Sequence, residues 1–242
     1  MIRRSEAVVL SQQVFRESSV LLTVYSKEEG LLKLIAKGVR SSRRRKSGGG
    51  FQPGQLLQIV YYYKPSRDLQ YLSESTPQSF QLRIFTEPIR ILYVLLFLEI
   101  FTKIVREEEP NPRLYALLTE TIHTYENIGQ GFFSVLIRNL LKLTAQAGCC
   151  PMVATEEWRS APLQLQLETG QIITCKFGEA QPAVTHLARF LKSNPSEEQE
   201  IKVPKPDREA TLTLMLRFLE VQVPGFETPK SYSVFKSVFT NP

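Results

Sequence analysis

The sequence predicts an α+β multidomain protein in which a small N-terminal β-barrel is followed by an α-helical domain with a small hairpin insertion. Three observations lead to this prediction. Short segments of β-branched and aliphatic residues, separated by turn residues, fill residues 1–79. In residues 80–242 apolar side chains recur at steps of three and four, the period of an amphipathic helix. That period is lost in residues 151–182, where we expect the insertion.

Five strands are expected before residue 80. Each is rich in β-branched, aliphatic or aromatic residues and is bounded by turn residues such as the Glu29-Gly30 pair. The expected strands are Ala7–Gln13, Val20–Tyr25, Leu31–Ala36, Gln55–Tyr63 and Leu69–Glu74. Short strands protect their edges by curling into a closed barrel, and the OB-fold is the commonest five-stranded solution.

Helical segments are expected on both sides of the insertion, and their ends carry capping signals. Asn111 stands before Pro112, as an N-cap residue does before a proline in the first turn. Gly148 follows an apolar repeat and is suited to end its helix. The expected helices start at Glu87–Pro88 and at Asn111–Pro112 and continue with segments 132–147, 183–192, 208–222 and 229–239. Stretch 193–206 should be a surface connection, and the tail should pack back on the helices.

Positive charge is concentrated in the barrel third of the chain. Residues 1–80 hold 13 Lys and Arg against 6 Asp and Glu, whereas residues 81–242 hold 17 against 18. A field this uneven attracts polyanions, so nucleic acid and anionic membrane surfaces are the first partners to consider. A membrane is the weaker interpretation, because no apolar helix face lies beside the basic residues to insert into lipid.

The basic residues gather between Lys37 and Lys46, where charge, serine and glycine leave no apolar face of either period. No acid lies between Gly30 and Lys64 to compensate them. Like charges in one loop repel each other, and a polyanion that neutralises them relieves this repulsion and releases counterions. A solvated loop without a ligand is the alternative. We expect phosphate contacts from six residues: Lys37, Arg40, Arg43, Arg44, Arg45 and Lys46.

Three consecutive tyrosines, Tyr61–Tyr63, end the fourth expected strand and offer rings on which bases can stack. Successive side chains of a strand point to opposite faces. The interpretation that we favour places Tyr61 and Tyr63 in the barrel core, which leaves Tyr62 as the ring that a nucleic acid can reach.

The sequence offers no pattern for catalysis, and we expect a binding protein and not an enzyme. His123 and His186 lie in separate helical segments without a nucleophile motif, and the glycines after Ser47 lack the ending of a nucleotide-binding loop. Cys149 and Cys150 are expected to be small buried residues at a helix end. Without a long apolar segment or a signal-peptide pattern, we expect a cytoplasmic protein with no membrane contact. Binding to DNA would make this protein nucleoid-associated.

Several motifs resemble the RecO family of bacterial recombination mediators. The most specific are Ala36-Lys37-Gly38-Val39-Arg40 and Phe51-Gln52-Pro53-Gly54, and looser matches are Leu140–Gly148 with Pro151 and the tail Pro229–Tyr232. The resemblance implies an OB-fold, a helical domain, and DNA contacts on the six basic residues. It also implies binding of single- and double-stranded DNA without sequence specificity, annealing of complementary strands, and loading of RecA with RecR on DNA coated with SSB, whose C-terminal tail is a partner.

One departure from the family concerns a metal. Many RecO-like proteins hold zinc with two Cys-x-x-Cys pairs in the region that matches 151–178. The first pair falls here near Glu156 and Arg159, and the second on Cys175 and Gly178, so a single thiolate remains. One thiolate cannot hold the ion. We therefore expect no cofactor and a degenerate zinc-finger-like insertion that its own packing stabilises, with Trp158 as an anchor.

Two other functions remain open at this point. The helical domain could be a protein–protein adaptor, with a peptide groove formed by exposed apolar residues among Leu136, Leu140, Leu143, Phe235 and Phe239. Alternatively, the barrel could bind RNA, because phosphate contacts do not distinguish the two sugars.

Overall fold

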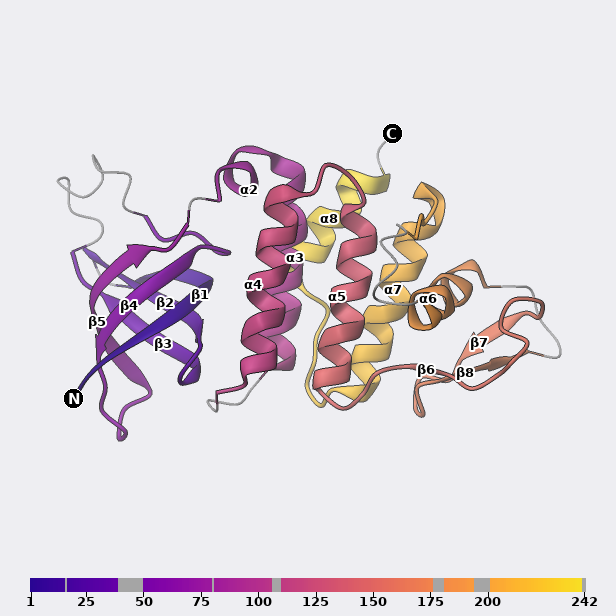
Figure 1. Cartoon of the computed structure of the whole chain (residues 1–242), viewed down its shortest axis with the longest axis horizontal. Coiled ribbons are helices and arrows are strands. Elements are labelled where there is room, and N and C mark those ends of the chain that lie inside the picture. The colour runs from indigo at the N-terminus through magenta and orange to yellow at the C-terminus, as the bar shows by residue number, and fades with distance from the viewer. Residues whose placement is uncertain are drawn as a thin grey trace. The chain divides into compact units, whose positions relative to one another are not determined.

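The computed structural model describes residues 1–15, 17–38, 50–79, 81–105, 110–175, 181–193 and 201–240, without the side chains of 238–240. The chain forms two compact units, residues 1–127 and 128–242. Figure 1 labels their elements along the chain. The first unit holds the barrel together with the helices that follow it, so the expected boundary after residue 79 does not coincide with the division into compact units.

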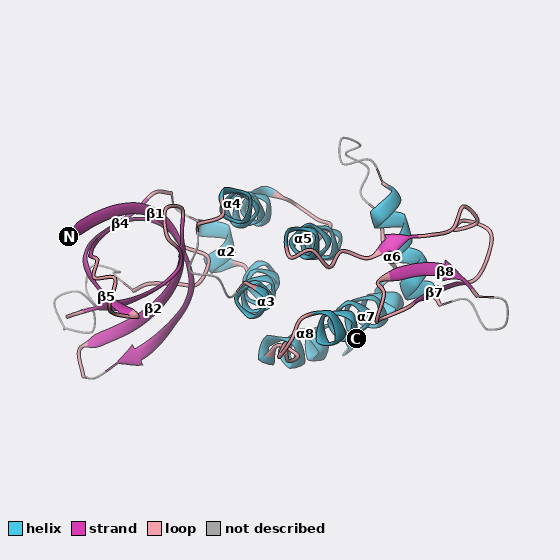
Figure 2. Ribbon diagram, turned by 90° about the horizontal axis from the view of Figure 1, so that it is seen from below, coloured by secondary structure: helices cyan, strands magenta, loops and turns pink. Residues whose placement is uncertain are grey.

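The first unit begins with a closed barrel, as the sequence predicted. Its strands are β1 (Ile2–Phe15), β2 (Ser19–Ser26), β3 (Gly30–Ala36), β4 (Leu56–Tyr62) and β5 (Leu69–Pro77). They follow the order β1-β2-β3-β5-β4, and β4 closes the ring by pairing antiparallel with β1. Figure 2 shows the strands curled around a common interior. The pairing of β3 with β5 is parallel, whereas the other pairings in the barrel are antiparallel.

Alternation along each strand fills the barrel interior. The inward side chains form one apolar cluster, to which Tyr61 contributes a fully buried ring. The cluster comprises Ala7, Val9, Val20, Leu22, Val24, Leu32, Leu34, Ala36, Phe51, Leu57, Ile59 and Tyr61. Residues between these positions point to the outer face, where they are free to contact helices or ligands.

Gly54 marks a close approach between the barrel and a helix. Its backbone has φ +87°, and a Cβ built there would lie 3.0 Å from Val94 Cγ1. Any larger residue would meet both a strained backbone and the Val94 side chain. The Phe51–Gly54 motif therefore helps to seat the barrel on the helix that carries Val94.

Three helices complete the first unit: α2 (Leu82–Thr86), α3 (Pro88–Ile104) and α4 (Pro112–Asn127). The predicted cap of α4 is confirmed, because Asn111 Oδ1 accepts hydrogen bonds from the backbone N–H groups of Arg113 and Leu114. Helix α3 buries apolar residues around most of its circumference, among them Leu92, Phe97 and Phe101, as expected of a helix without a polar face. The sequence did not predict α2.

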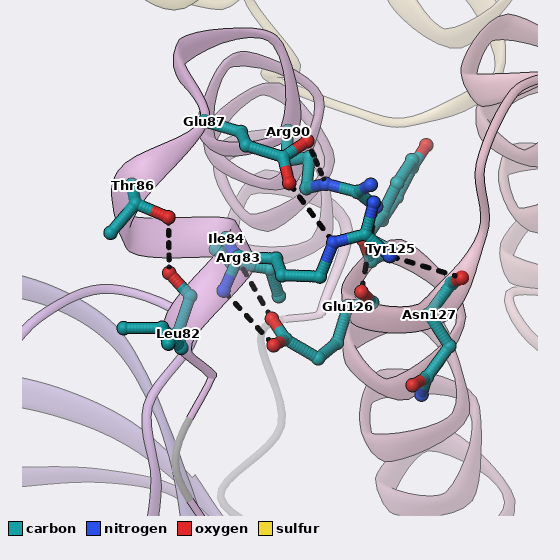
Figure 3. A network of polar contacts seen from close by, with 9 residues as sticks. All are labelled: Leu82, Arg83, Ile84, Thr86, Glu87, Arg90, Tyr125, Glu126 and Asn127. Carbon is teal, nitrogen blue, oxygen red and sulfur yellow. Dashed lines mark hydrogen bonds and ion pairs between the residues drawn. The ribbon is translucent and has the colours of Figure 1, made fainter.

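A network of charged groups holds α2 against α3 and α4 (Figure 3). The Glu126 carboxylate accepts hydrogen bonds of 3.0 Å from the backbone N–H groups of Arg83 and Ile84, and so caps the start of α2 from another helix. Glu87 accepts from Arg90 at 2.5 Å and from Arg83 at 2.9 Å, and these bonds lower its pKa. Arg90 is 1% exposed and donates to the Tyr125 carbonyl at 2.6 Å.

The second unit combines helices with a small sheet. Its elements are α5 (Phe132–Gln146), β6 (Met152–Val153), β7 (Leu163–Leu165), β8 (Gln171–Thr174), α6 (Pro182–Lys192), α7 (Lys205–Gln222) and α8 (Lys230–Thr240). The expected hairpin is present as β7 and β8, and β6 adds a parallel strand to it. The predicted end of α5 is confirmed, since Gly148 follows the helix with φ +75°.

Some sequence-based expectations for the second unit were wrong. Ile201 and Val203, which were assigned to a surface connection, are 9% and 2% exposed, and the Ile201 carbonyl accepts a hydrogen bond from Ser134 on α5. Trp158 is only partly buried under the Arg159 guanidinium, so it is no anchor. Residues 176–180 and 194–200 lie outside the described part of the chain.

The tail does pack back on the helices of the second unit. The Phe235 ring on α8 is 1% exposed. The Tyr232 hydroxyl bonds Thr213 on α7 at 2.6 Å, and Lys236 pairs with Glu209 on the same helix at 2.7 Å. This contact confirms the docking that was predicted from the three- and four-residue spacing of the aromatic rings.

Candidate nucleic-acid interface

Lys37 is the one member of the predicted basic set that the described residues include. It follows directly after β3, is exposed, and holds its Nζ 4.5 Å from the centroid of the Tyr71 ring on β5. An ammonium group over an aromatic face is attracted by the negative charge of the ring face. The other predicted contacts, Arg40, Arg43, Arg44, Arg45 and Lys46, lie outside the described residues.

The three consecutive tyrosines divide between the two faces of β4, as alternation predicted. Tyr61 is fully buried in the barrel core, and Tyr63 packs against the same core. Burial raises the pKa of the Tyr61 hydroxyl well above the ordinary value for tyrosine, so this group stays protonated. Tyr62 points outward with 47% of its surface exposed, which makes it the ring of the three that a ligand can reach.

An ion pair between Arg3 and Glu29 lies near the start of β1. The Arg3 guanidinium lies 3.7 Å from the centroid of the Tyr63 ring and also pairs with the Glu29 carboxylate. A cation held by an aromatic face and a carboxylate has little remaining attraction for a phosphate. We therefore place Arg3 in the structure of the barrel and leave it out of the candidate interface.

Strand pairing places a second ring beside Tyr62. Tyr71 on β5 is directly opposite Tyr62, and Ile2 on β1 is directly opposite Tyr62 from the other side. Ile35 on β3 is in turn opposite Tyr71. We call these four residues, Ile2, Tyr62, Tyr71 and Ile35, the outer row. Directly opposite residues share a face and have Cβ atoms about 5 Å apart, so the row crosses four strands on the outside of the barrel.

Sequence reasoning missed Tyr71 as a neighbour of Tyr62 and Lys37. The available signal was the alternation within the fifth expected strand, which places Tyr71 and Leu72 on opposite faces of the strand. Its position depends on the parallel pairing of β3 with β5, which joins segments that are far apart in the chain. No local pattern of residues reports such a pairing.

The remaining candidate groups do not form a reaction centre in the described residues. His186 Nε2 lies 2.8 Å from Asp207 Oδ2 and links α6 to α7, a structural role. Burial raises the pKa of the partly buried thiols of Cys149 and Cys150, which keeps them protonated and unreactive. The expectation of full burial for this pair was wrong. Within the described ranges, no group of three His, Cys, Asp or Glu side chains could hold a metal ion.

The peptide groove that was considered for the second unit does not exist on the residues named for it. Leu136, Leu140, Leu143 and Phe235 are each at most 1% exposed, because they form the core of the unit, and the side chain of Phe239 lies outside the described part. The same unit has a pocket of about 960 Å³ between α6, α7 and β7, lined by both Asp207 and Arg217. In the portion of the chain that the structure describes, no helix is long and apolar enough to cross a membrane.

Two family profiles match most of the region described above. The profile "Recombination protein O N terminal" matches residues 1–80, and the profile "Recombination protein O C terminal" matches residues 86–166. The first match covers the barrel with the outer row and Lys37. The second covers α3, α4, α5 and the start of the small sheet.

Several curated relatives of the chain are named "DNA repair protein RecO". The relative from Christiangramia forsetii is 26% identical over 99% of this chain and 100% of its own length. The relative from Salinibacter ruber is 39% identical over 50% of this chain and 46% of its own length. The relative from Chlorobium limicola is 29% identical over 76% of this chain and 72% of its own length.

Proposed function

Because the chain belongs to the RecO family of DNA repair proteins, we propose that it is a DNA-binding recombination mediator and not an enzyme. In this proposal the barrel holds single- and double-stranded DNA through its phosphates, without reading base sequence. Neutralised strands can approach each other, so the protein anneals complementary strands. It also helps to load RecA, together with RecR, on DNA coated with SSB.

The observation that carries the proposal is the uncompensated charge after β3. Six basic residues stand between Lys37 and Lys46, and no acid lies between Gly30 and Lys64. Binding of phosphates to such a run is favourable, because counterions are released and the repulsion between the basic residues is relieved. Lys37 opens the run, and its ammonium lies over the ring of Tyr71, which is directly opposite Tyr62 on the neighbouring strand.

A salt titration tests the proposal. In the full chain, Arg43, Arg44, Arg45 and Lys46 are replaced together by Ala, and binding to a labelled single-stranded oligonucleotide is followed by fluorescence anisotropy over a salt series. The loss of four phosphate contacts should reduce the slope of log K against log salt by about 3, at roughly 0.7 per contact for single strands.

The matched control replaces four basic residues of the second unit, Arg138, Lys142, Arg189 and Lys192, by Ala. The slope of this control should stay close to that of the unchanged protein. If the loop variant keeps the original slope, the basic run is not part of the interface. If the unchanged protein binds neither single strands nor duplex at low salt, the proposed function itself is wrong.

A further inference from the structure

Three residues of the outer row, Ile2, Tyr62 and Tyr71, form an apolar and aromatic surface on the barrel, whereas Ile35 at the β3 end of the row is only 7% exposed. Ile2 is 62% exposed and Tyr62 is 47% exposed, and they face each other across β1 and β4. Tyr71, partly exposed, continues the row on β5. Adjoining exposed apolar side chains usually mark a contact surface, since folding alone gives no reason to keep them in water.

The charges around the row are arranged unevenly. At one end Lys37 lies over the Tyr71 ring, and the basic run continues from it. Val60 lies two residues before Tyr62 on β4. Arg4 on β1 and Glu74 on β5 are directly opposite Val60 on its two sides, so their charges compensate each other. The uncompensated positive charge therefore lies at the β3 end of the row. A polyanion that covers the rings is drawn toward Lys37.

We propose that the outer row is a stacking platform for unpaired bases, so that this end of the barrel binds single-stranded DNA in preference to duplex. The inference rests on the proposed function and names the form of DNA that this site takes. Tyr62 and Tyr71 are directly opposite on neighbouring strands, which places two rings side by side for neighbouring bases of one strand. The phosphates between those bases then meet Lys37.

The distinction between strands follows from the chemistry of stacking. In a duplex both faces of each base are already covered by its neighbours, and the groups that remain accessible are the groove edges and the phosphates. A duplex can therefore use the basic residues but not the rings. An unpaired strand can use both, because every unpaired base offers a π face. Removal of the rings should therefore weaken the binding of single-stranded DNA and leave the binding of duplex DNA unchanged.

The test compares a labelled oligo(dT) with a duplex of the same length, at one salt concentration, in the full chain. Tyr62→Leu and Tyr71→Leu should each weaken binding of oligo(dT) by about tenfold, the usual effect of truncating one stacking ring, and leave duplex binding within about twofold. The phenylalanine variants Tyr62→Phe and Tyr71→Phe retain a ring and should restore binding. Trp158→Leu is the matched control, because it removes a partly exposed ring under a cation in the second unit and should leave both affinities unchanged.

Two results would overturn the platform while leaving the proposed function in place: equal losses for oligo(dT) and duplex, or no loss for either. A protein that binds neither DNA would instead contradict the proposed function. A fluorescence measurement on the unchanged protein tests stacking without any variant, so its result does not depend on whether a variant folds. An oligonucleotide that carries 2-aminopurine should lose fluorescence when its base stacks on a tyrosine, and fluorescence that rises on binding would contradict stacking.

Discussion

Arg90 shows at the scale of one residue what a local pattern cannot reveal. In the sequence it stands just before an apolar segment, and nothing there indicates burial. In the structure its side chain is 1% exposed and bonds the carbonyl of Tyr125, a residue 35 positions away. Burial of a charge is tolerable only where such partners exist. Glu87 is a local partner, but the Tyr125 carbonyl comes from the end of another helix, so the full burial of Arg90 follows from the fold and cannot be read from the sequence.

We predict that Arg90→Met lowers the free energy of unfolding by about 2 kcal/mol, because the buried Tyr125 carbonyl loses a charged donor. Arg83→Met is the matched control. Arg83 shares the Glu87 carboxylate but is largely exposed, so its loss should cost less than about 0.5 kcal/mol. Urea unfolding followed by circular dichroism measures both values. Equal effects of the two substitutions would mean that burial of Arg90 adds nothing to stability.

The tyrosines show how far the candidate site could be predicted at this scale. Alternation within one strand was enough to assign Tyr61 to the core and Tyr62 to the surface, because a strand has a fixed period of two. It was not enough to find Tyr71, since the register between strands that are remote in sequence depends on closure of the whole barrel. The basic run could be recognised from composition alone, and its role stays a prediction.

At the scale of elements, the strands and long helices could be predicted because each has a strong period of its own. The five expected strands agree with β1–β5 apart from their ends, and the caps of α4 and α5 fall where Asn111 and Gly148 indicated. Helix α2 escaped prediction because it has five residues, of which Ile84 alone is buried, and because its cap comes from Glu126 on α4. A cap from another helix leaves no local signal.

The small sheet of β6, β7 and β8 is held by packing in its described residues. Leu163, Leu165 and Ile172 are at most 6% exposed. Gln222 Nε2 on α7 donates to the carbonyls of Leu167 at 2.6 Å and Glu168 at 2.9 Å. We propose that these contacts stabilise the segment in place of the zinc ion that the family resemblance implies for it.

We predict that metal removal leaves the protein unchanged. A structural zinc contributes roughly 10 to 16 kcal/mol in small zinc-finger peptides, so dialysis of a zinc-dependent sheet against a chelator should cause a large loss of stability. Here we expect the same unfolding midpoint before and after dialysis against EDTA, and elemental analysis should find substoichiometric zinc. Cys175→Ser should also change the midpoint little. A chelator-dependent midpoint, or one zinc ion per chain, would show that other side chains bind the metal.

At the scale of the whole molecule, the two compact units differ in charge. Residues 1–127 hold 18 Lys and Arg against 13 Asp and Glu, whereas residues 128–242 hold 12 against 11. The excess positive charge therefore belongs to the unit with the barrel and the outer row. We expect DNA to bind this unit and to stabilise it, since a ligand that binds only the folded form adds to the free energy of unfolding.

The one tryptophan of the chain, Trp158, allows the two units to be followed separately, because its fluorescence reports on residues 128–242 while circular dichroism reports on both units. Urea is the appropriate denaturant, since it is uncharged and does not screen phosphate contacts as a salt would. We predict that single-stranded DNA at a hundred times its dissociation constant stabilises the first unit by about 2.7 kcal/mol. The part of the circular dichroism transition that belongs to the first unit should then move to higher urea, while the Trp158 transition stays in place. Two curves that coincide and move together would show that the units unfold as one cooperative block, because stabilisation of one would then be shared by the other.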